Sequence, residues 1–293
     1  MKVYKSKKAK DKIRATYDQL LSIWGIPVTE QDIETAYGAT HIVECGKDRN
    51  PPLVLFHGVG DDSALMWIYN AKALAVHFHL YAVDTIGGPG KSCPNQIYDT
   101  DFDQIWWLDD VFDRLGLAHF CIAGVSNGAY IAQHYGIMRP DKVDKILCMS
   151  GSAVSADQTK NPLGRMLKVF LPEALFPTGR NMERLIKKLA GDHYARFTEN
   201  PVIMAHYTHL LKGFNNMAMA RHKIKQFQEA DLLSIRDKTL LLMGEEDPLV
   251  DIPKVKEMMS RYGLQYRFFP GVGHGINHEI SDEINAIMIQ YFG

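Results

Sequence analysis

The feature that most constrains this chain is a glycine-flanked serine placed between an apolar run and a helical pattern. The apolar run covers residues 119–123, a G-x-S-x-G motif follows at 124–128, and residues 129–135 have the pattern of a helix. The two glycines allow an unusual backbone conformation because they lack a Cβ atom. A strand, a sharp turn and a helix in this order would present the Ser126 hydroxyl at the end of a strand, where it can act as a nucleophile.

Short apolar runs that alternate with helical patterns fill most of the chain. The pattern predicts a hairpin over 31–45, six further strands near 52–56, 80–83, 119–123, 143–149, 239–243 and 266–269, and helices over 9–24, from 63, over 101–115 and over 279–291. Apolar runs without alternation are typical of parallel strands that are buried on both faces. The sequence therefore predicts an α/β fold with a mostly parallel eight-stranded sheet flanked by helices.

Residues 154–232 interrupt this alternation. They contain several helical segments and no convincing strand, and they precede the last two predicted strands. We interpret them as a helical cap inserted over the sheet edge. The core domain is then formed by residues 1–153 and 233–293.

The composition is that of an ordinary globular protein and excludes several classes of function. The 293 residues include 33 Lys and Arg against 34 Asp and Glu, which indicates no nucleic-acid partner. No stretch reaches the ~18 apolar residues that a membrane span needs, and no signal peptide is indicated. The oligomeric state is not constrained. The four cysteines lack metal-ligand spacing, so we expect no metal and a cytoplasmic protein with reduced thiols.

A serine nucleophile needs a base to remove its proton and a carboxylate to orient that base. Asp247, which precedes a proline in the loop after the run at 239–243, is the predicted carboxylate. His274, which lies between two glycines after the last predicted strand, is the predicted base. The alternatives are Glu245, Glu246 and Asp251 for the carboxylate and His278 for the base.

Backbone N–H groups are expected to hold the negative charge that develops during attack at a carbonyl. Asn127, directly after the serine, is predicted to supply one, and Val59, after the strand at 52–56, the other. We expect His57 to brace its loop rather than to react.

The remaining polar clusters favour ordinary packing or surface positions. The pairs His77 and His79, and His206 and His209, are more typical of such positions than of a metal site. The glycine-rich stretch 87–90 lacks the helix start of a phosphate-binding loop, so no nucleotide cofactor is predicted.

Five motifs in this order make the chain similar to the α/β-hydrolase superfamily over residues 30–293. They are His57-Gly58, the loop from Asp84 to Ser92, Gly124-x-Ser126-x-Gly128, Gly244-x-x-Asp247 and Gly273-His274. The version of the second motif that begins at Asp84 resembles that of bacterial carboxylesterases related to the naproxen esterase.

The resemblance implies an α/β-hydrolase fold and a serine hydrolase that cleaves a carboxylic ester through an acyl-enzyme intermediate without a cofactor. Large apolar residues in the predicted cap favour a small or medium apolar ester as substrate. The residues predicted to line the pocket are Met166, Phe170, Tyr207 and Phe214. Alternatives on the same triad are a lactone or carbon–carbon bond hydrolase and a cofactor-free haloperoxidase. A small-molecule receptor on the same fold is a further alternative.

Overall fold

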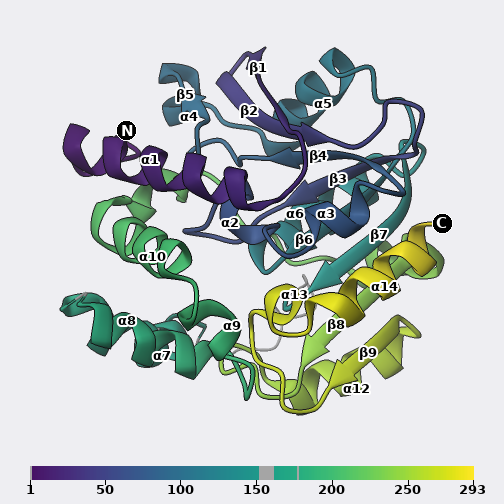
Figure 1. Ribbon diagram of the computed structural model, residues 1–293. Helices are drawn as coiled ribbons and strands as arrows, with labels where there is room; N and C mark the ends of the chain where they lie inside the picture. The colour runs from purple at the N-terminus through teal and green to yellow at the C-terminus, as the bar shows by residue number, and fades with distance from the viewer. Residues whose placement is uncertain (1, 152–161, 177) are drawn as a thin grey trace.

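The computed structural model of the chain describes residues 2–151, 162–176 and 178–293 (Figure 1). Its strands are β1 (Thr29–Thr35), β2 (Gly38–Cys45), β3 (Pro52–Phe56), β4 (His79–Val83), β5 (Cys93–Pro94), β6 (Phe120–Val125), β7 (Val143–Met149), β8 (Thr239–Gly244) and β9 (Gln265–Phe269).

The described strands form one nine-stranded sheet in the order β1-β2-β4-β3-β6-β7-β8-β9, with β5 paired to β2. All neighbouring pairs from β4 to β9 in this order are parallel, whereas β2 is antiparallel to both of its neighbours, β1 and β4. The predicted count of eight strands is therefore wrong by one. The ninth strand, β5, has only two residues and pairs with Gly38 and Ala39, so it is too short to show a periodic pattern.

The helices predicted over 9–24, from 63, over 101–115 and over 279–291 are present with shifted ends, whereas the helix at Ile252–Tyr262 was not predicted. The described helices are α1 (Lys7–Ile23), α2 (Ser63–Met66), α3 (Ala71–Leu74), α4 (Gln96–Thr100), α5 (Gln104–Arg114), α6 (Asn127–Met138), α7 (Pro162–Leu175), α8 (Gly179–Leu189), α9 (Ala195–Thr198), α10 (Pro201–Gly213), α11 (Glu229–Ser234), α12 (Ile252–Tyr262), α13 (Ile276–Glu279) and α14 (Ser281–Phe292), with short 3₁₀ turns η2 (Asn216–Met219) and η3 (Arg236–Lys238).

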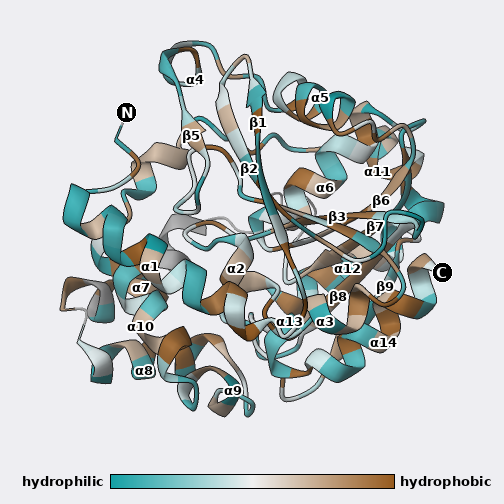
Figure 2. Cartoon of the chain, turned by 45° about the horizontal axis from the view of Figure 1, so that its top comes forward, coloured by the Kyte–Doolittle hydropathy of each residue, from teal (hydrophilic) through white to brown (hydrophobic). Residues whose placement is uncertain are grey.

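Successive residues of the central strands supply two separate cores, one on each face of the sheet. Leu53 and Leu55 of β3 pack into a cluster with α1, α3 and α14, whereas Val54 and Phe56 pack into a cluster with α5, α6 and α12. Side chains along a strand point alternately to opposite faces, so a strand covered on both sides must be apolar throughout. In Figure 2 the central strands are largely hydrophobic, and the helices alternate between hydrophobic and hydrophilic segments.

The loops that carry the predicted site residues all leave the same edge of the sheet. Phe56 at the end of β3 pairs with Gly124 of β6, and Val125 pairs with Met149 at the end of β7. Gly244, which ends β8, pairs with Phe269 of β9. Because these strands are parallel, their carboxyl ends lie side by side, which is where sites form in open α/β sheets.

Helices α7 to α10 lie between β7 and β8 in the chain, and in Figure 1 α10 lies between α1 and the other three. Helix α10 packs against α1. The predicted boundary between residues 153 and 154 falls outside the described residues, so the division into core and cap stays a prediction. None of the described helices is long and apolar enough to cross a membrane.

Candidate active site

Ser126 occupies a strained turn between β6 and α6. Its backbone angles are φ 55° and ψ −116°, which lie outside the regions that residues with a side chain commonly adopt. Its N–H donates a hydrogen bond of 2.8 Å to the carbonyl of Met149, which fixes the turn to the neighbouring strand. Strained serines of this kind are typical of nucleophiles that a rigid scaffold holds at a strand end.

The two glycines of the motif are required by the closeness of the backbone on either side of Ser126. A Cβ on Gly124 would lie 2.1 Å from the carbonyl oxygen of Gly128. A Cβ on Gly128 would lie 2.4 Å from the carbonyl oxygen of Phe56. Any side chain at these positions would push α6 away from β3 and β6, so the motif sets the height of Ser126 above the sheet.

Asp247 and His274 meet at the ends of β8 and β9. The side chain of Asp247 is 0% exposed, and its Oδ2 lies 2.7 Å from His274 Nδ1. The other oxygen, Oδ1, accepts a 2.9 Å hydrogen bond from the N–H of Leu249. The alternative carboxylates Glu245 and Glu246 are exposed, and Glu245 forms an ion pair with a lysine at 2.5 Å. Among these three neighbouring carboxylates, only Asp247 is buried against a histidine.

The surroundings of His274 favour its protonated form. Burial opposes protonation, but the negative charge of Asp247 and the hydrogen bond to it outweigh burial, and the pKa of His274 is raised. His274 Nδ1 must donate to the carboxylate, which leaves Nε2 as the acceptor in the neutral ring. His274 and the Ser126 hydroxyl are not hydrogen-bonded to each other in this structure. Such catalytic contacts commonly tighten only when substrate binds.

Glu279 holds the loop that carries His274, and its role was not predicted. This carboxylate is 2% exposed and accepts hydrogen bonds of 2.8–2.9 Å from the N–H groups of Gly191, Gly273 and Gly275. Burial raises the pKa of Glu279, although the three backbone hydrogen bonds oppose the rise. The N–H of His274 also donates to the carbonyl of Leu189, at the end of α8. The loop is therefore fixed from α13 and from the predicted cap.

The loop after β3 lies against Ser126. A Cβ on Gly58 would be 3.4 Å from the Cβ of Ser126, and Val59 follows with 49% of its surface exposed. Among the described residues, the amides of Val59 and Asn127 donate to no backbone carbonyl. Asn127 is the first residue of α6, where N–H groups have no partner within the helix.

Two histidines near the site are occupied by structural contacts. His57 accepts a hydrogen bond from the N–H of Thr85 at 2.9 Å, and its Nδ1 donates to the carbonyl of Gly58 at 2.8 Å. His278 is 2% exposed and donates from Nε2 to the carbonyl of Met66 at 2.8 Å. Burial lowers the pKa of His278 to about 4. Both rings are packed and hydrogen-bonded inside the core.

The four residues predicted to line a pocket lie in different surroundings. Phe170 and Tyr207 are half-buried and pack against the core cluster of α1 and α14. Burial raises the pKa of Tyr207 well above its usual range, and the nearby carboxylates of the β3 loop raise it further. Phe214 is 2% exposed and packs with Val3 in a separate small cluster. The side chain of Met166, on α7, is outside the described part of the chain. A role of these four in the pocket stays a prediction.

Comparison with known proteins identifies the family. Residues 51–279 match the sequence model of the alpha/beta hydrolase fold family, and the chain belongs to that family. Carboxylesterase YbfK of Bacillus subtilis (strain 168) is 28% identical over 281 residues, which cover 94% of this chain and 91% of the relative. The uncharacterized carboxylesterase nap of the same organism is 27% identical over 291 residues, with the same coverage.

A solved structure shows the same fold. The crystal structure of naproxen esterase (carboxylesterase NP) from Bacillus subtilis matches with a TM-score of 0.84 and 23% identity, over 99% of this chain and 100% of that one. The predicted α/β-hydrolase fold and the predicted similarity to carboxylesterases are therefore confirmed. The chain is a carboxylesterase-like hydrolase.

Proposed function

We propose that the chain is a serine carboxylesterase whose nucleophile, base and carboxylate are Ser126, His274 and Asp247. The observation that carries this proposal is the hydrogen bond of 2.7 Å between the buried carboxylate of Asp247 and His274, at the sheet edge where the strained Ser126 turn also lies. The carboxylesterase relatives support ester cleavage as the reaction.

The proposed reaction has two halves. In the first, Ser126 Oγ attacks the ester carbonyl while His274 Nε2 takes the hydroxyl proton, and the proton then passes to the leaving alcohol. In the second, His274 removes a proton from water, which attacks the acyl group on Ser126, and the proton then passes from His274 to Ser126 Oγ as the acid is released. Asp247 keeps the imidazole in the correct tautomer and stabilises its positive charge. The N–H groups of Val59 and Asn127 hold the carbonyl oxygen as it becomes negative.

The proposed substrate is a small or medium ester with an apolar acyl or alcohol group. The half-buried rings of Phe170 and Tyr207 support this, because aromatic side chains in the predicted cap can cover an apolar ligand. No cofactor takes part in the proposed steps. A cytoplasmic location also stays a prediction.

The activity should fall in acid with an apparent pKa above the ordinary imidazole value of about 6.5. His274 must be neutral to accept the serine proton, and Asp247 raises its pKa, so the active form is lost as the pH drops through that raised value. The measurement is kcat/KM for p-nitrophenyl butyrate from about pH 5 to about pH 9. An acidic limb at or below the ordinary imidazole value would contradict the assignment of the Asp247–His274 pair.

The reaction class is tested by comparing four types of substrate at equal concentration. The substrates are p-nitrophenyl acetate and butyrate as esters, an aliphatic γ-lactone, and a dienone acid that requires carbon–carbon cleavage. The fourth type is a halogenation substrate, which is supplied together with peroxide. We expect kcat/KM for the esters to exceed the other values by about two orders of magnitude or more, since one site rarely stabilises such different transition states equally. Faster cleavage of the lactone or of the dienone acid would replace the carboxylesterase proposal with that reaction.

A further inference from the structure

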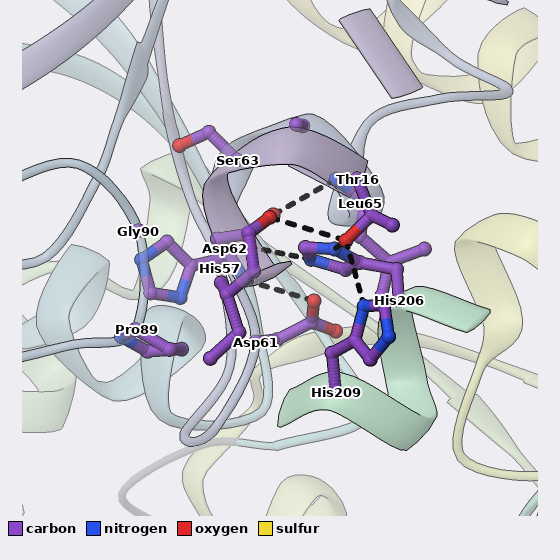
Figure 3. A network of polar contacts seen from close by, with 12 residues as sticks. Thr16, His57, Asp61, Asp62, Ser63, Leu65, Pro89, Gly90, His206 and His209 are labelled. Carbon is purple, nitrogen blue, oxygen red and sulfur yellow. Dashed lines mark hydrogen bonds and ion pairs between the residues drawn. The ribbon is translucent and has the colours of Figure 1, made fainter. Parts of the chain in front are cut away.

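Asp62 and His206 form a completely buried pair between the loop after β3 and helix α10. Both side chains are 0% exposed, and His206 Nε2 lies 2.7 Å from Asp62 Oδ2 (Figure 3). The two residues are 144 positions apart in the chain. The pair therefore joins the α/β core to a helix of the predicted cap.

The hydrogen-bond donors of this pair can be assigned from its partners. The other oxygen of Asp62 accepts a 3.1 Å hydrogen bond from the N–H of Leu65, so the carboxylate caps α2. Because a carboxylate only accepts, His206 Nε2 carries a hydrogen and donates it. Burial alone would raise the pKa of Asp62, but the charge and hydrogen bond of His206 outweigh it and lower the pKa, which keeps the carboxylate ionised.

The opposite side of the imidazole is fixed by helix α1. His206 Nδ1 lies 2.7 Å from Thr16 Oγ1 (Figure 3). Thr16 Oγ1 in turn lies 3.1 Å from the carbonyl oxygens of Lys12 and Ile13. Both ring nitrogens of His206 thus have partners on other elements. The ring cannot rotate without breaking a buried hydrogen bond, which makes it a rigid support for Asp62.

Asp62 in turn ends the short loop that carries Val59. At its start, His57 is held by the N–H of Thr85, and at its end Asp62 is held by His206. Between these two points the Gly58 carbonyl accepts hydrogen bonds from His57 Nδ1 at 2.8 Å and from the N–H of Asp61 at 3.4 Å. The N–H of Asp62 donates to Asp61 Oδ1 at 2.8 Å, so these contacts lie within the loop or at its two ends. The position of the Val59 amide therefore depends on the two fixed ends of the loop.

We propose that His206 is a positioning residue, which holds the Val59 amide in the oxyanion hole through Asp62. This inference rests on the proposed function of Ser126 and Val59. Helix α10 would then have a role in catalysis, because its contact with Asp62 helps to hold the oxyanion hole in place.

The test compares His206→Gln with His206→Ala. The amide nitrogen of Gln can take the place of the imidazole Nε2 and donate to Asp62, whereas Ala leaves the carboxylate without this donor. We expect kcat for p-nitrophenyl butyrate to fall about 10- to 100-fold in the Ala variant with KM changed less than about threefold, because an oxyanion donor acts mainly in the transition state. The Gln variant should keep most of the wild-type kcat.

A matched control is Thr208→Ala on the same helix, because within the described part of the chain the Thr208 hydroxyl donates only to the carbonyl of Met204, at 2.8 Å. It should leave kcat and KM unchanged. Circular dichroism checks that each variant is folded. If the Ala variant does not fold, the double variant Asp62→Asn with His206→Leu removes the pair without a buried charge, and it should show the same loss of kcat.

The inference would be overturned by a folded His206→Ala enzyme, or a folded double variant, with kcat within about twofold of the wild type, or by a change in KM alone. Failure of the proposed function is distinguishable from this result. In that case the wild type itself would show no ester turnover and no dependence on Ser126.

Discussion

Ser126→Ala is expected to lower kcat/KM for p-nitrophenyl butyrate by about four to six orders of magnitude. The substitution removes the only atom that forms the covalent bond to the acyl group, so no other residue of the site can complete the first half of the reaction. The fold should be unaffected, because Ala is smaller than Ser and Gly124 and Gly128 still permit the strained turn. The measurement is initial rate against substrate concentration, with the melting temperature recorded alongside.

The matched control is Ser234→Ala, on α11, where the hydroxyl donates to the nearby carbonyl of Asp231 and to no other described residue. This variant should keep full activity. A Ser126→Ala enzyme that retains more than about 1% of the wild-type rate would show that another group is the nucleophile or that general base catalysis by water suffices.

Asp247→Asn is expected to lower kcat/KM by about three to four orders of magnitude. The N–H of Leu249 is a fixed donor to Oδ1, so the amide oxygen of Asn should take that place and its NH₂ group should face His274. The imidazole would then accept at Nδ1 and carry its hydrogen on Nε2, where it cannot take the serine proton. Loss of the negative charge should also move the acidic limb of residual activity to lower pH.

Glu246→Gln provides the comparison for this variant, since Glu246 adjoins Asp247 in sequence and is exposed. Its activity should equal that of the wild type. A nearly active Asp247→Asn enzyme together with an inactive Glu246→Gln enzyme would reverse the assignment of the carboxylate.

The buried strands are predictable from the sequence because each is apolar on both faces. Leu53 and Val54 face opposite cores, and so do Leu241 and Leu242, so these strands stand out as continuous apolar runs. Strand β5 has no such signal, since it consists of two residues at an edge. The strained turn at Ser126 is equally predictable from the sequence, because the close approach of the backbone on either side requires glycine at two fixed positions.

The groups that support the site cannot be predicted in this way. Asp62 and His206 become partners only through the packing of α10 on the core, and the sequence pattern around His206 predicts only packing or a surface position. Glu279 likewise has no signal in the sequence, because its function depends on three amides from two separate loops. Long-range polar contacts leave no periodic pattern in a sequence. The one available signal is that a histidine or a carboxylate among apolar residues needs a polar partner if it is buried, but this signal does not say which residue the partner is.

The most direct test of the proposed serine site is covalent labelling with a fluorophosphonate probe, followed by mass spectrometry of the peptides. The probe reacts with serines that an adjacent base activates, and its phosphonyl oxygen occupies the oxyanion hole. We expect a single label on Ser126, formed at a rate that falls in parallel with ester turnover as His274 becomes protonated. Labelling of a different residue, or no label on Ser126 in an enzyme that hydrolyses esters, would contradict the assignment of Ser126 as the nucleophile.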